Sequence, residues 1–322
     1  MDMLLINLQS PIIMFFMLGL FAGLVRSDLE IPTIMAKGFA LYLIAAIGLK
    51  GGMAITNEPI PDSFITLILV GVAAGFILPF IGYGLLRKTS TIGPIDAAAI
   101  AGHYGSVSLV TFIAAGEFLR SQTGTGASGQ FVALLAFMES PAILAALLLA
   151  APHLGNKATK RRKRDIAREV FLNGTMVLLL GSMLIGAVTP DKELSTLTTV
   201  FVDPFKGVLC FFLLDMGIRI GRQFKALSHI EPSVLSFAFT MPLIGSVFAL
   251  GLSAMIGLGH SEAFLFITLC ASASYIAVPA ALKIALPEAN DALYTALPLA
   301  LSFPFNIALG IPLYYWLAGF LG

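Results

Sequence analysis

Two stretches decide the fold of this chain: AGHYGSVSLVT at residues 101–111 and ASASYIAVPAA at residues 271–281. Each lies inside a long apolar segment, yet each places glycine, serine or proline where a helix in lipid usually carries leucine. Proline and hydroxyl side chains both disturb the regular hydrogen bonding of a helix. Each stretch therefore predicts an interruption in a helix, and the two interruptions fall in opposite halves of the chain.

The composition indicates a chain that is surrounded mostly by lipid. Of its 322 residues, 58% are hydrophobic and only 11% are charged, and the mean hydropathy is +0.94. Soluble globular chains carry about 25% charged residues. The apolar runs are continuous and do not alternate, which favours helices over a β-barrel. The predicted fold class is therefore an all-α integral membrane protein.

Ten apolar segments are long enough to cross about 30 Å of hydrocarbon as helices. The two stretches quoted above lie in the fourth and the ninth of these segments, so these two helices are predicted to be discontinuous. The ten predicted spans are 9–26, 32–54, 62–86, 94–117, 128–151, 170–189, 197–219, 232–257, 262–284 and 292–319.

A basic loop at residues 153–169 predicts the orientation of the chain. Seven Lys and Arg residues fall within the twelve positions 157–168. Loops of this kind face the cytoplasm, and with five spans on either side both termini then lie outside. Fifteen of the nineteen Lys and Arg residues fall on the cytoplasmic side in this arrangement. We expect a multi-pass protein of a bacterial inner (plasma) membrane.

The basic loop itself has three interpretations. It can act only as a topology anchor, it can bind anionic lipid headgroups, or it can dock a soluble regulator. A short loop between two spans disfavours nucleic acid as a partner.

The two halves of the chain resemble each other. Four segments recur in the same order, with starting points 163 to 170 residues apart. Each half, 1–152 and 170–322, holds five spans, so an odd number of crossings inverts the second half in the membrane. The matching segments are 10–25 with 173–188, 39–52 with 208–221, 102–115 with 272–285, and 137–149 with 301–313.

Paired interruptions in an inverted repeat indicate a transport site. Secondary transporters place substrate and ion near the midplane, where discontinuous helices meet. The N-termini of the half-helices present N–H groups to an anion, whereas their C-termini and serine hydroxyls offer oxygen atoms to sodium. The alternative is that glycine and serine only allow helices to pack closely.

A few polar side chains inside the spans are further candidates, because ionisable groups at membrane depth are costly. Glu139 lies near the middle of the fifth span, where it can bind an ion, act as a gate residue or make a structural hydrogen bond. His103 lies at the first interruption and can bind substrate, sense protons or be a satisfied buried histidine. Asp215 and Arg219 are one helical turn apart and are predicted to pair. We find no motif typical of an enzyme or a metal site.

With these segments in hand, the chain resembles the cyanobacterial sodium-dependent bicarbonate permeases. The resemblance covers nearly the whole length, and the order and spacing of its motifs carry it. The motifs are IGLKGGMAI at 47–55, GHYGSVSLVTFIAA at 102–115, FMESPA at 137–142 and ASASYIAVPAALKIALPEAN at 271–290.

The resemblance implies a ten-span symporter that couples inward sodium flow to anion uptake, with bicarbonate as the favoured substrate and sodium as the coupling ion. It also implies a homotrimer without an organic cofactor, and movement of a core domain against a gate domain. The substrate positions that it implies are Gly105, Ser106, Val107, Ser108, Ser272, Ala273 and Ser274. The ion positions are Ser108, Glu139, Ser274 and Ser302, and further candidates are His103, Tyr104, Tyr275 and Asn306.

The sequence departs from that family at three places. The ninth span of the family reads SSSD where this chain reads SASY, so that Ala273 replaces a serine and Tyr275 replaces an aspartate. His103 and Tyr104 stand where the family has an apolar pair. The family's soluble partner is a PII-like nucleotide-sensing protein, and the short basic loop leaves that partnership open.

Three other functions stay open at this point. The chain can transport another small anion, such as a monocarboxylate, with a proton or sodium as the coupling ion. It can form a channel-like anion pore, which would show flux without ion coupling. A membrane enzyme is the least favoured, because no catalytic constellation is evident.

Overall fold

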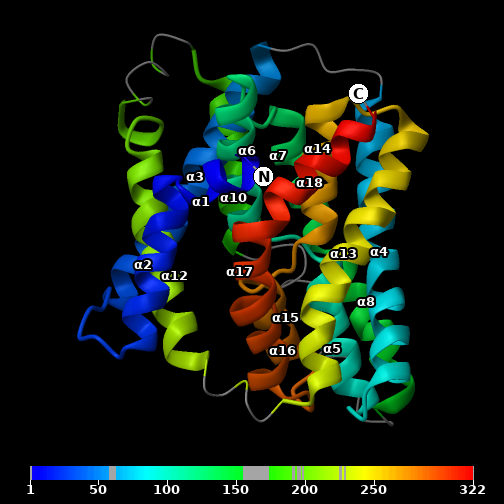
Figure 1. The fold of residues 1–322 in the computed structure, drawn as a ribbon. Coiled ribbons are helices and arrows are strands. Elements are labelled where there is room, and N and C mark those ends of the chain that lie inside the picture. Colours follow the sequence, from blue (N-terminus) through cyan, green and yellow to red (C-terminus); the bar gives the residue numbers. More distant parts are fainter. Residues whose placement is uncertain are drawn as a thin grey trace. The chain divides into compact units, whose positions relative to one another are not determined.

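The computed structural model describes residues 2–57, 63–154, 174–190, 193, 197, 199–224, 227 and 230–321 (Figure 1). In this part of the chain 84% of residues are helical and there are no strands. The all-helical prediction is therefore confirmed. Residues 155–173, which include most of the basic loop predicted at 153–169, lie outside the described residues.

Six helical stretches in the described ranges are long and apolar enough to cross a membrane: Thr33–Thr56, Phe64–Thr89, Pro94–Thr123, Gly129–His153, Pro232–Ile256 and Asp291–Leu321. Three shorter apolar helices, Pro11–Leu24, Gly174–Val188 and His260–Ala271, lie at other predicted spans.

Two helix boundaries differ from the predicted ones for local reasons. The seventh predicted span started at residue 197, whereas the helix α12 begins at Phe205, directly after Pro204. The fourth was predicted to end at residue 117 but continues to Thr123, where Gly124 ends it with a left-handed backbone (φ 79°). Glycine adopts this conformation without steric cost.

The chain forms two compact units, and each of them draws on both halves of the sequence. The first unit comprises Met1–Ile60, Gly126–Ala133 and Gly174–Ser228. The second unit comprises Pro61–Thr125, Leu134–Asn173 and His229–Gly322.

In the first unit, glycines bring continuous helices together in pairs. Helix α2 packs along α12, and α3 packs along α10; Figure 1 shows the first pair side by side. A Cβ atom on Gly19 or Gly23 would meet the backbone of α12. The helices of this unit are α1 (Asp2–Leu8), α2 (Pro11–Leu24), α3 (Thr33–Asn57), α10 (Gly174–Val188) and α12 (Phe205–Gln223).

The glycine contacts also give the direction of each pair. Gly48 lies against Leu179 and Gly52 against Met183, so residue numbers rise together along α3 and α10. The same holds for α2 and α12. Both pairs are therefore parallel, and their backbones approach closely in the manner of small-residue contacts between membrane helices.

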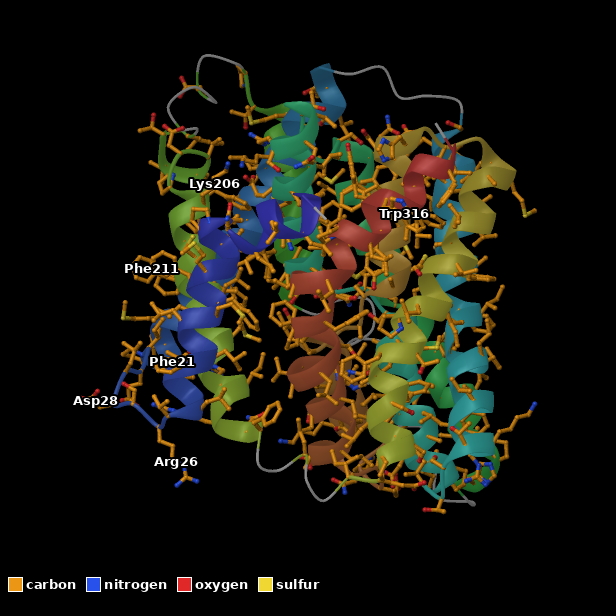
Figure 2. All side chains as sticks on the ribbon, viewed as in Figure 1. Phe21, Arg26, Asp28, Lys206, Phe211 and Trp316 are labelled. Carbon is orange, nitrogen blue, oxygen red and sulfur yellow. The ribbon has the colours of Figure 1, made fainter. Side chains whose placement is uncertain are left out.

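The outward faces of α2 and α12 are apolar. Phe21 is 63% exposed and Phe211 is 50% exposed, and both lie between the ends of their helices (Figure 2). The labelled charged residues stand at the helix ends, Lys206 at the start of α12 and Arg26 and Asp28 in the turn after α2. An apolar belt bounded by charges is typical of helices that face lipid.

The second unit contains the interrupted helices. Helices α4, α5 and α8 pack on one another (Figure 1), and α13, α14 and α18 form a corresponding group. Helix α7 (Gly129–Glu139) ends in this unit. The other helices are α4 (Phe64–Thr89), α5 (Pro94–Gly105), α6 (Leu109–Thr123), α8 (Pro141–Ala150), α13 (Pro232–Ile256), α14 (His260–Ala271), α15 (Ala277–Ala285), α16 (Asp291–Leu297), α17 (Phe303–Phe305) and α18 (Ile311–Ala318).

The last membrane helix is irregular at two points. It includes two π-helical turns, η4 (Pro298–Ser302) and η5 (Asn306–Gly310). Such turns appear often at functional sites. Here they begin or end at Ser302 and Asn306, two of the predicted site residues.

Candidate functional site

Both predicted interruptions are present. Helix α5 ends at Gly105, residues 106–108 are extended, and α6 begins at Leu109. Helix α14 ends at Ala271, residues 272–276 are not helical, and α15 begins at Ala277. All thirteen predicted site residues belong to the second unit, so the fold brings them into one compact body.

The two interruptions hold each other by reciprocal hydrogen bonds. The Ser274 amide donates to the carbonyl of His103 at 2.9 Å, and His103 Nδ1 donates to the carbonyl of Ser274 at 2.5 Å. The start of α15 is thereby attached to the end of α5. The Ser108 amide donates to Ser272 Oγ at 2.8 Å, which attaches the start of α6 to the end of α14.

Serine side chains replace the backbone bonds that a continuous helix would make. Ser108 Oγ accepts from the Thr111 amide at 3.2 Å and from Thr111 Oγ1 at 3.0 Å, so Ser108 caps α6. Ser272 Oγ donates to the Leu269 carbonyl at 2.8 Å, which satisfies an acceptor at the end of α14. A buried backbone group without such a partner would be costly, and this explains why both interruptions are rich in serine.

The start of α6 keeps open hydrogen-bond donors. A helix leaves its first amides without acceptors inside the helix. Ser108 satisfies the amides of Thr111 and Phe112, whereas the amides of Leu109 and Val110 have no hydrogen-bond acceptor among the described residues. Together with the partial positive charge of a helix N-terminus, two open amides are suited to a small anion.

Close packing explains why Gly105 ends α5. A Cβ atom at this position would collide with the ring of Pro79 and with the carbonyl of Gly75, both on α4. Gly102 is similarly restricted by Ala146 on α8. The close contacts of the two glycines are of the kind that the packing alternative predicts, whereas the serines carry hydrogen bonds.

The irregular last helix packs polar groups against both interruptions. Ser302 Oγ donates to the Ala238 carbonyl at 2.6 Å and accepts from the Tyr104 hydroxyl at 2.7 Å. Asn306 Nδ2 donates to the Ala271 carbonyl at 3.1 Å. The Tyr314 hydroxyl donates to Asn306 Oδ1 at 2.6 Å. These hydrogen bonds attach the irregular last helix to α13, to α5 and to the end of α14.

The Glu139 region joins the first interruption through its backbone. Ser106 Oγ donates to the carbonyl of Glu139 at 3.1 Å. Glu139 is 7% exposed and ends α7, and Ser140 separates it from Pro141, which begins α8. The residue whose carbonyl holds the first interruption therefore also carries a buried carboxyl group.

These interruptions meet in a chain whose sequence matches a transporter family. The model of the Na+-dependent bicarbonate transporter superfamily matches residues 11–319. The chain belongs to this superfamily. Curated proteins gave no match to the chain. The resemblance found from the sequence motifs is thus confirmed at the level of the family.

The superfamily is described as Na+-dependent, so the residues that could bind a cation matter for the site. In the described part of the chain, no group of three or more His, Cys, Asp or Glu residues could hold a metal ion. Sodium is a hard cation that takes neutral oxygen ligands as well as carboxylates. The serine hydroxyls at the two interruptions, on Ser106, Ser108, Ser272 and Ser274, are neutral oxygen atoms of that kind.

Two side-chain atoms at the interruptions are buried without a hydrogen-bond partner in the part of the chain that is described. They are His103 Nε2 and the Tyr275 hydroxyl. The His103 side chain is 0% exposed, and its ring packs on Tyr294 at 5.3 Å. The Tyr275 ring packs on Phe303 at 5.1 Å. Both residues are ones at which the sequence departs from the family pattern.

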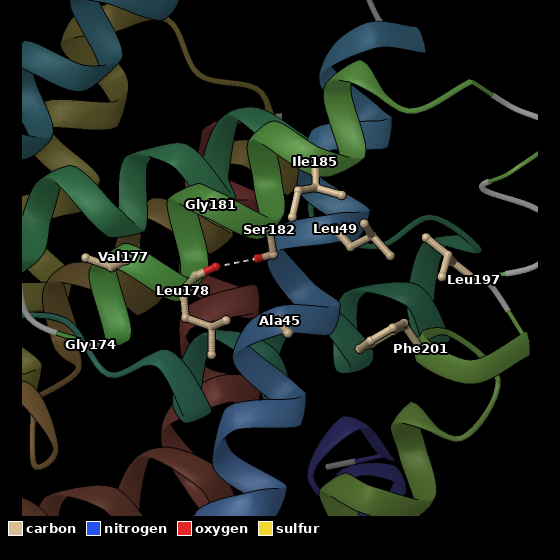
Figure 3. Close-up of a pocket in the computed structure, with 10 residues that line it drawn as sticks. All are labelled: Ala45, Leu49, Gly174, Val177, Leu178, Gly181, Ser182, Ile185, Leu197 and Phe201. Atoms are coloured by element: carbon tan, nitrogen blue, oxygen red, sulfur yellow. Dashed lines mark hydrogen bonds between the residues drawn. The ribbon is translucent and has the colours of Figure 1, made fainter.

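A pocket in the first unit is of a different kind. Its volume is about 430 Å³ and its lining is apolar apart from Ser182 (Figure 3). The Ser182 hydroxyl donates to the Leu178 carbonyl at 2.7 Å, so it offers no free donor. The charged pair predicted in this unit is confirmed, because Arg219 Nε lies 2.7 Å from Asp215 Oδ2. Neither feature provides an anion site.

Sequence reasoning missed several residues that shape the site. Thr111 stands three positions after Ser108, which is the spacing of a helix cap, so this signal was available. Tyr314 and Tyr294 contact the site from distant parts of the sequence, and no local pattern marks them.

Proposed function

We propose that this superfamily member imports bicarbonate together with sodium, at a site formed by the two interrupted helices of the second unit. The observation that carries the proposal is that hydrogen bonds join the two interruptions to each other. Beside this contact, the amides of Leu109 and Val110 stay open at the start of α6. Family membership supplies the substrate and the ion. The site opens to one side of the membrane and then to the other, as alternating access requires.

Ten spans in two inverted repeats underlie this proposal, and helix packing supports them. The pair α2–α12 joins the first span to the seventh, and the pair α3–α10 joins the second to the sixth. Exchanging the halves converts one pair into the other. Both pairs run parallel, which agrees with odd-numbered spans pairing with odd and even with even.

The second unit shows the same correspondence. The pair α4–α5 corresponds to α13–α14, and α5–α8 corresponds to α14–α18. The proposed topology places both termini outside, as the basic loop predicts. A homotrimer and a PII-like regulator are carried over from the resemblance alone, and the loop that would meet the regulator lies largely outside the described residues.

The residues divide into two roles in this proposal. The open amides and the surrounding hydroxyls bind the anion, whereas oxygen atoms of the interruptions bind sodium. The proposed anion site consists of Gly105, Ser106, Val107, Ser108, Ser272, Ala273 and Ser274, and the proposed sodium ligands are Ser108, Glu139, Ser274 and Ser302.

One feature favours a second candidate function. Tyr275 stands where the family pattern has an aspartate, so one carboxylate is missing beside the second interruption. A site with less negative charge binds sodium less strongly. The second candidate is therefore transport of another small anion, such as a monocarboxylate, with a proton as the coupling ion.

Uptake by purified protein in liposomes tests the proposal and separates the two candidates. Labelled bicarbonate is offered with an inward sodium gradient, with a pH gradient in potassium, or with neither, and uptake by protein-free liposomes is subtracted. We expect saturable uptake that sodium stimulates. Uptake of a labelled monocarboxylate that the pH gradient drives, without sodium-stimulated uptake of bicarbonate, would favour the second candidate. Bicarbonate uptake that neither gradient stimulates would indicate a channel-like pore.

A further inference from the structure

Two buried side-chain atoms at the interruptions have no hydrogen-bond partner in the part of the chain that the structure describes. They are His103 Nε2 and the Tyr275 hydroxyl. Native proteins satisfy nearly all their buried polar side-chain atoms, so an exception needs an explanation. Both atoms belong to the proposed site, and a bound molecule is one such explanation.

The hydrogen bond at Nδ1 of His103 decides whether Nε2 donates or accepts a hydrogen bond. The carbonyl of Ser274 can only accept, so Nδ1 of His103 must carry the hydrogen of the 2.5 Å bond. In the neutral ring, Nε2 is then a lone-pair acceptor. Its missing partner is therefore a hydrogen-bond donor.

The Tyr275 hydroxyl supplies the opposite character. It lies near the Ser108 side chain but makes no hydrogen bond of normal geometry with it. Ser108 caps α6 next to the open amides of Leu109 and Val110. The phenolic O–H thus adds a donor to a place that already attracts an anion.

One acceptor and several donors match a particular kind of anion. Bicarbonate is planar, carries one negative charge and has one O–H group beside two unprotonated oxygens. Nitrate has the same shape and charge but no hydrogen. An acceptor in the site would recognise bicarbonate and penalise nitrate, because a buried acceptor facing nitrate stays unpaired.

We propose that His103 Nε2 accepts the hydrogen bond of the bicarbonate hydroxyl, while the Tyr275 hydroxyl donates to an unprotonated oxygen. His103 then determines selectivity for protonated oxyanions, and Tyr275 contributes affinity for oxyanions in general. This inference rests on the proposed function. The competing explanation is a buried water that satisfies Nε2.

Competition between the two anions tests the inference. Sodium-driven uptake of labelled bicarbonate is measured with increasing unlabelled bicarbonate or nitrate, for the native protein and for His103→Phe, His103→Gln and Tyr275→Phe. His260→Phe is the matched control, because His260 also bonds a backbone carbonyl, that of Tyr315, and packs on the Tyr315 ring at 4.4 Å, away from the site.

The expected results differ between the variants. His103→Phe lowers the preference for bicarbonate over nitrate about tenfold or more, as expected for one lost buried hydrogen bond. His103→Gln retains an acceptor and keeps most of the preference. Tyr275→Phe lowers the apparent affinity for bicarbonate and for nitrate by a similar factor and leaves the preference between them unchanged. His260→Phe changes neither quantity.

Each failure has a distinct meaning. If the native protein does not take up bicarbonate, the proposed function fails. If it does, but His103→Phe keeps the native preference, His103 does not read the anion hydroxyl and the inference is overturned in favour of buried water. If His103→Phe does not fold, His103→Met provides the same loss of the acceptor with a flexible side chain, and an unchanged preference in that variant overturns the inference equally.

Discussion

The two units of this transporter join the halves of the sequence in different ways. In the first unit, continuous helices meet through glycines, and backbone lies directly on backbone. In the second unit, interrupted helices meet through serines and a histidine, and hydrogen bonds replace helical ones. The first arrangement is a direct contact between backbones, whereas the second has open amides and side-chain atoms without a hydrogen-bond partner among the described residues.

The two kinds of helix contact differ in their capacity to bind a ligand inside a membrane protein. Glycine contacts stabilise a helix pair at no cost in unsatisfied polar groups. A helix interruption exposes backbone donors and acceptors that must be satisfied at membrane depth. In the second unit, serine, histidine and asparagine side chains satisfy many of the backbone groups at the interruptions. The hydrogen-bonding groups that stay open are the ones that we propose for substrate and ion.

The largest expected effect comes from filling a glycine contact of the first unit. A side chain at Gly186 on α10 would collide with the backbone of Leu49 on α3. We expect Gly186→Val to destabilise the protein by about 3 kcal/mol or to prevent folding, since helices packed at this distance cannot absorb a branched side chain. Thermal unfolding of purified protein in detergent measures the effect.

Gly181 on the same helix is the control for this substitution. A Cβ atom there would meet nothing within 4 Å. Gly181→Val should therefore shift the unfolding temperature only slightly. An equal fall in the unfolding temperature of both variants would show that helix propensity, and not the glycine contact, determines the stability of the first unit.

The second largest effect should follow from removing one serine hydroxyl at the interruptions. Ser272→Ala deletes the acceptor of the Ser108 amide and the donor to Leu269. We expect sodium-driven uptake to fall about 10- to 100-fold, which corresponds to roughly 1.4 to 2.8 kcal/mol. Ser253→Ala is the control, because the Ser253 hydroxyl is buried on α13 without a hydrogen-bond partner among the described residues, and its loss should leave uptake near the native rate.

The carboxylate at Glu139 should affect the ion more than the anion. Glu139→Gln keeps the size of the side chain but removes its charge. We expect the sodium concentration for half-maximal uptake to rise about tenfold, the size of one charge-assisted contact, while bicarbonate affinity at saturating sodium changes little. An unaltered sodium dependence would make Glu139 a structural residue.

The smallest effect concerns an exposed contact at the edge of the second unit. Hydrogen bonds from Ser233 and from Thr91 hold the pKa of the Glu231 carboxyl below its usual range. The resulting stabilisation is present above the usual pKa and is lost as the pH falls through the lowered value. Glu231→Gln should lower the unfolding temperature by about 1–2 °C at neutral pH.

The same variant provides its own pH control. Its unfolding temperature should converge with that of the native protein in acid, where the native carboxyl is protonated. A difference that persists unchanged in acid would assign the effect to the side-chain amide and not to the lost charge.

Much of the fold could be predicted from local sequence. The apolar runs placed the helices, and the small residues at 105–108 and 272–274 marked the interruptions because glycine and serine are unfavourable in a regular apolar helix. The Asp215–Arg219 pair followed from its spacing alone. The helix ends moved where a single residue, Pro204 or Gly124, decided the boundary.

The arrangement of the site needed the structure. Which serine satisfies which backbone group depends on helices more than 160 residues apart in sequence, as in the bond from Ser108 to Ser272. The same is true of the bond from His103 to Ser274, without which the open Nε2 could not be recognised. The division into two units also depends on long-range glycine contacts that no local pattern reveals.

The most direct test of the central claim is bicarbonate binding by the native protein and by Ser272→Ala, each measured at low and at high sodium. Because the proposed anion and sodium sites have Ser108 and Ser274 in common, sodium should tighten bicarbonate binding by about tenfold in the native protein, and bicarbonate should tighten sodium binding by the same factor. The coupling should be weakened strongly in Ser272→Ala, which loses the hydrogen bond between the start of α6 and the end of α14. Identical coupling in both proteins would contradict the claim that the meeting of the two interruptions is the transport site.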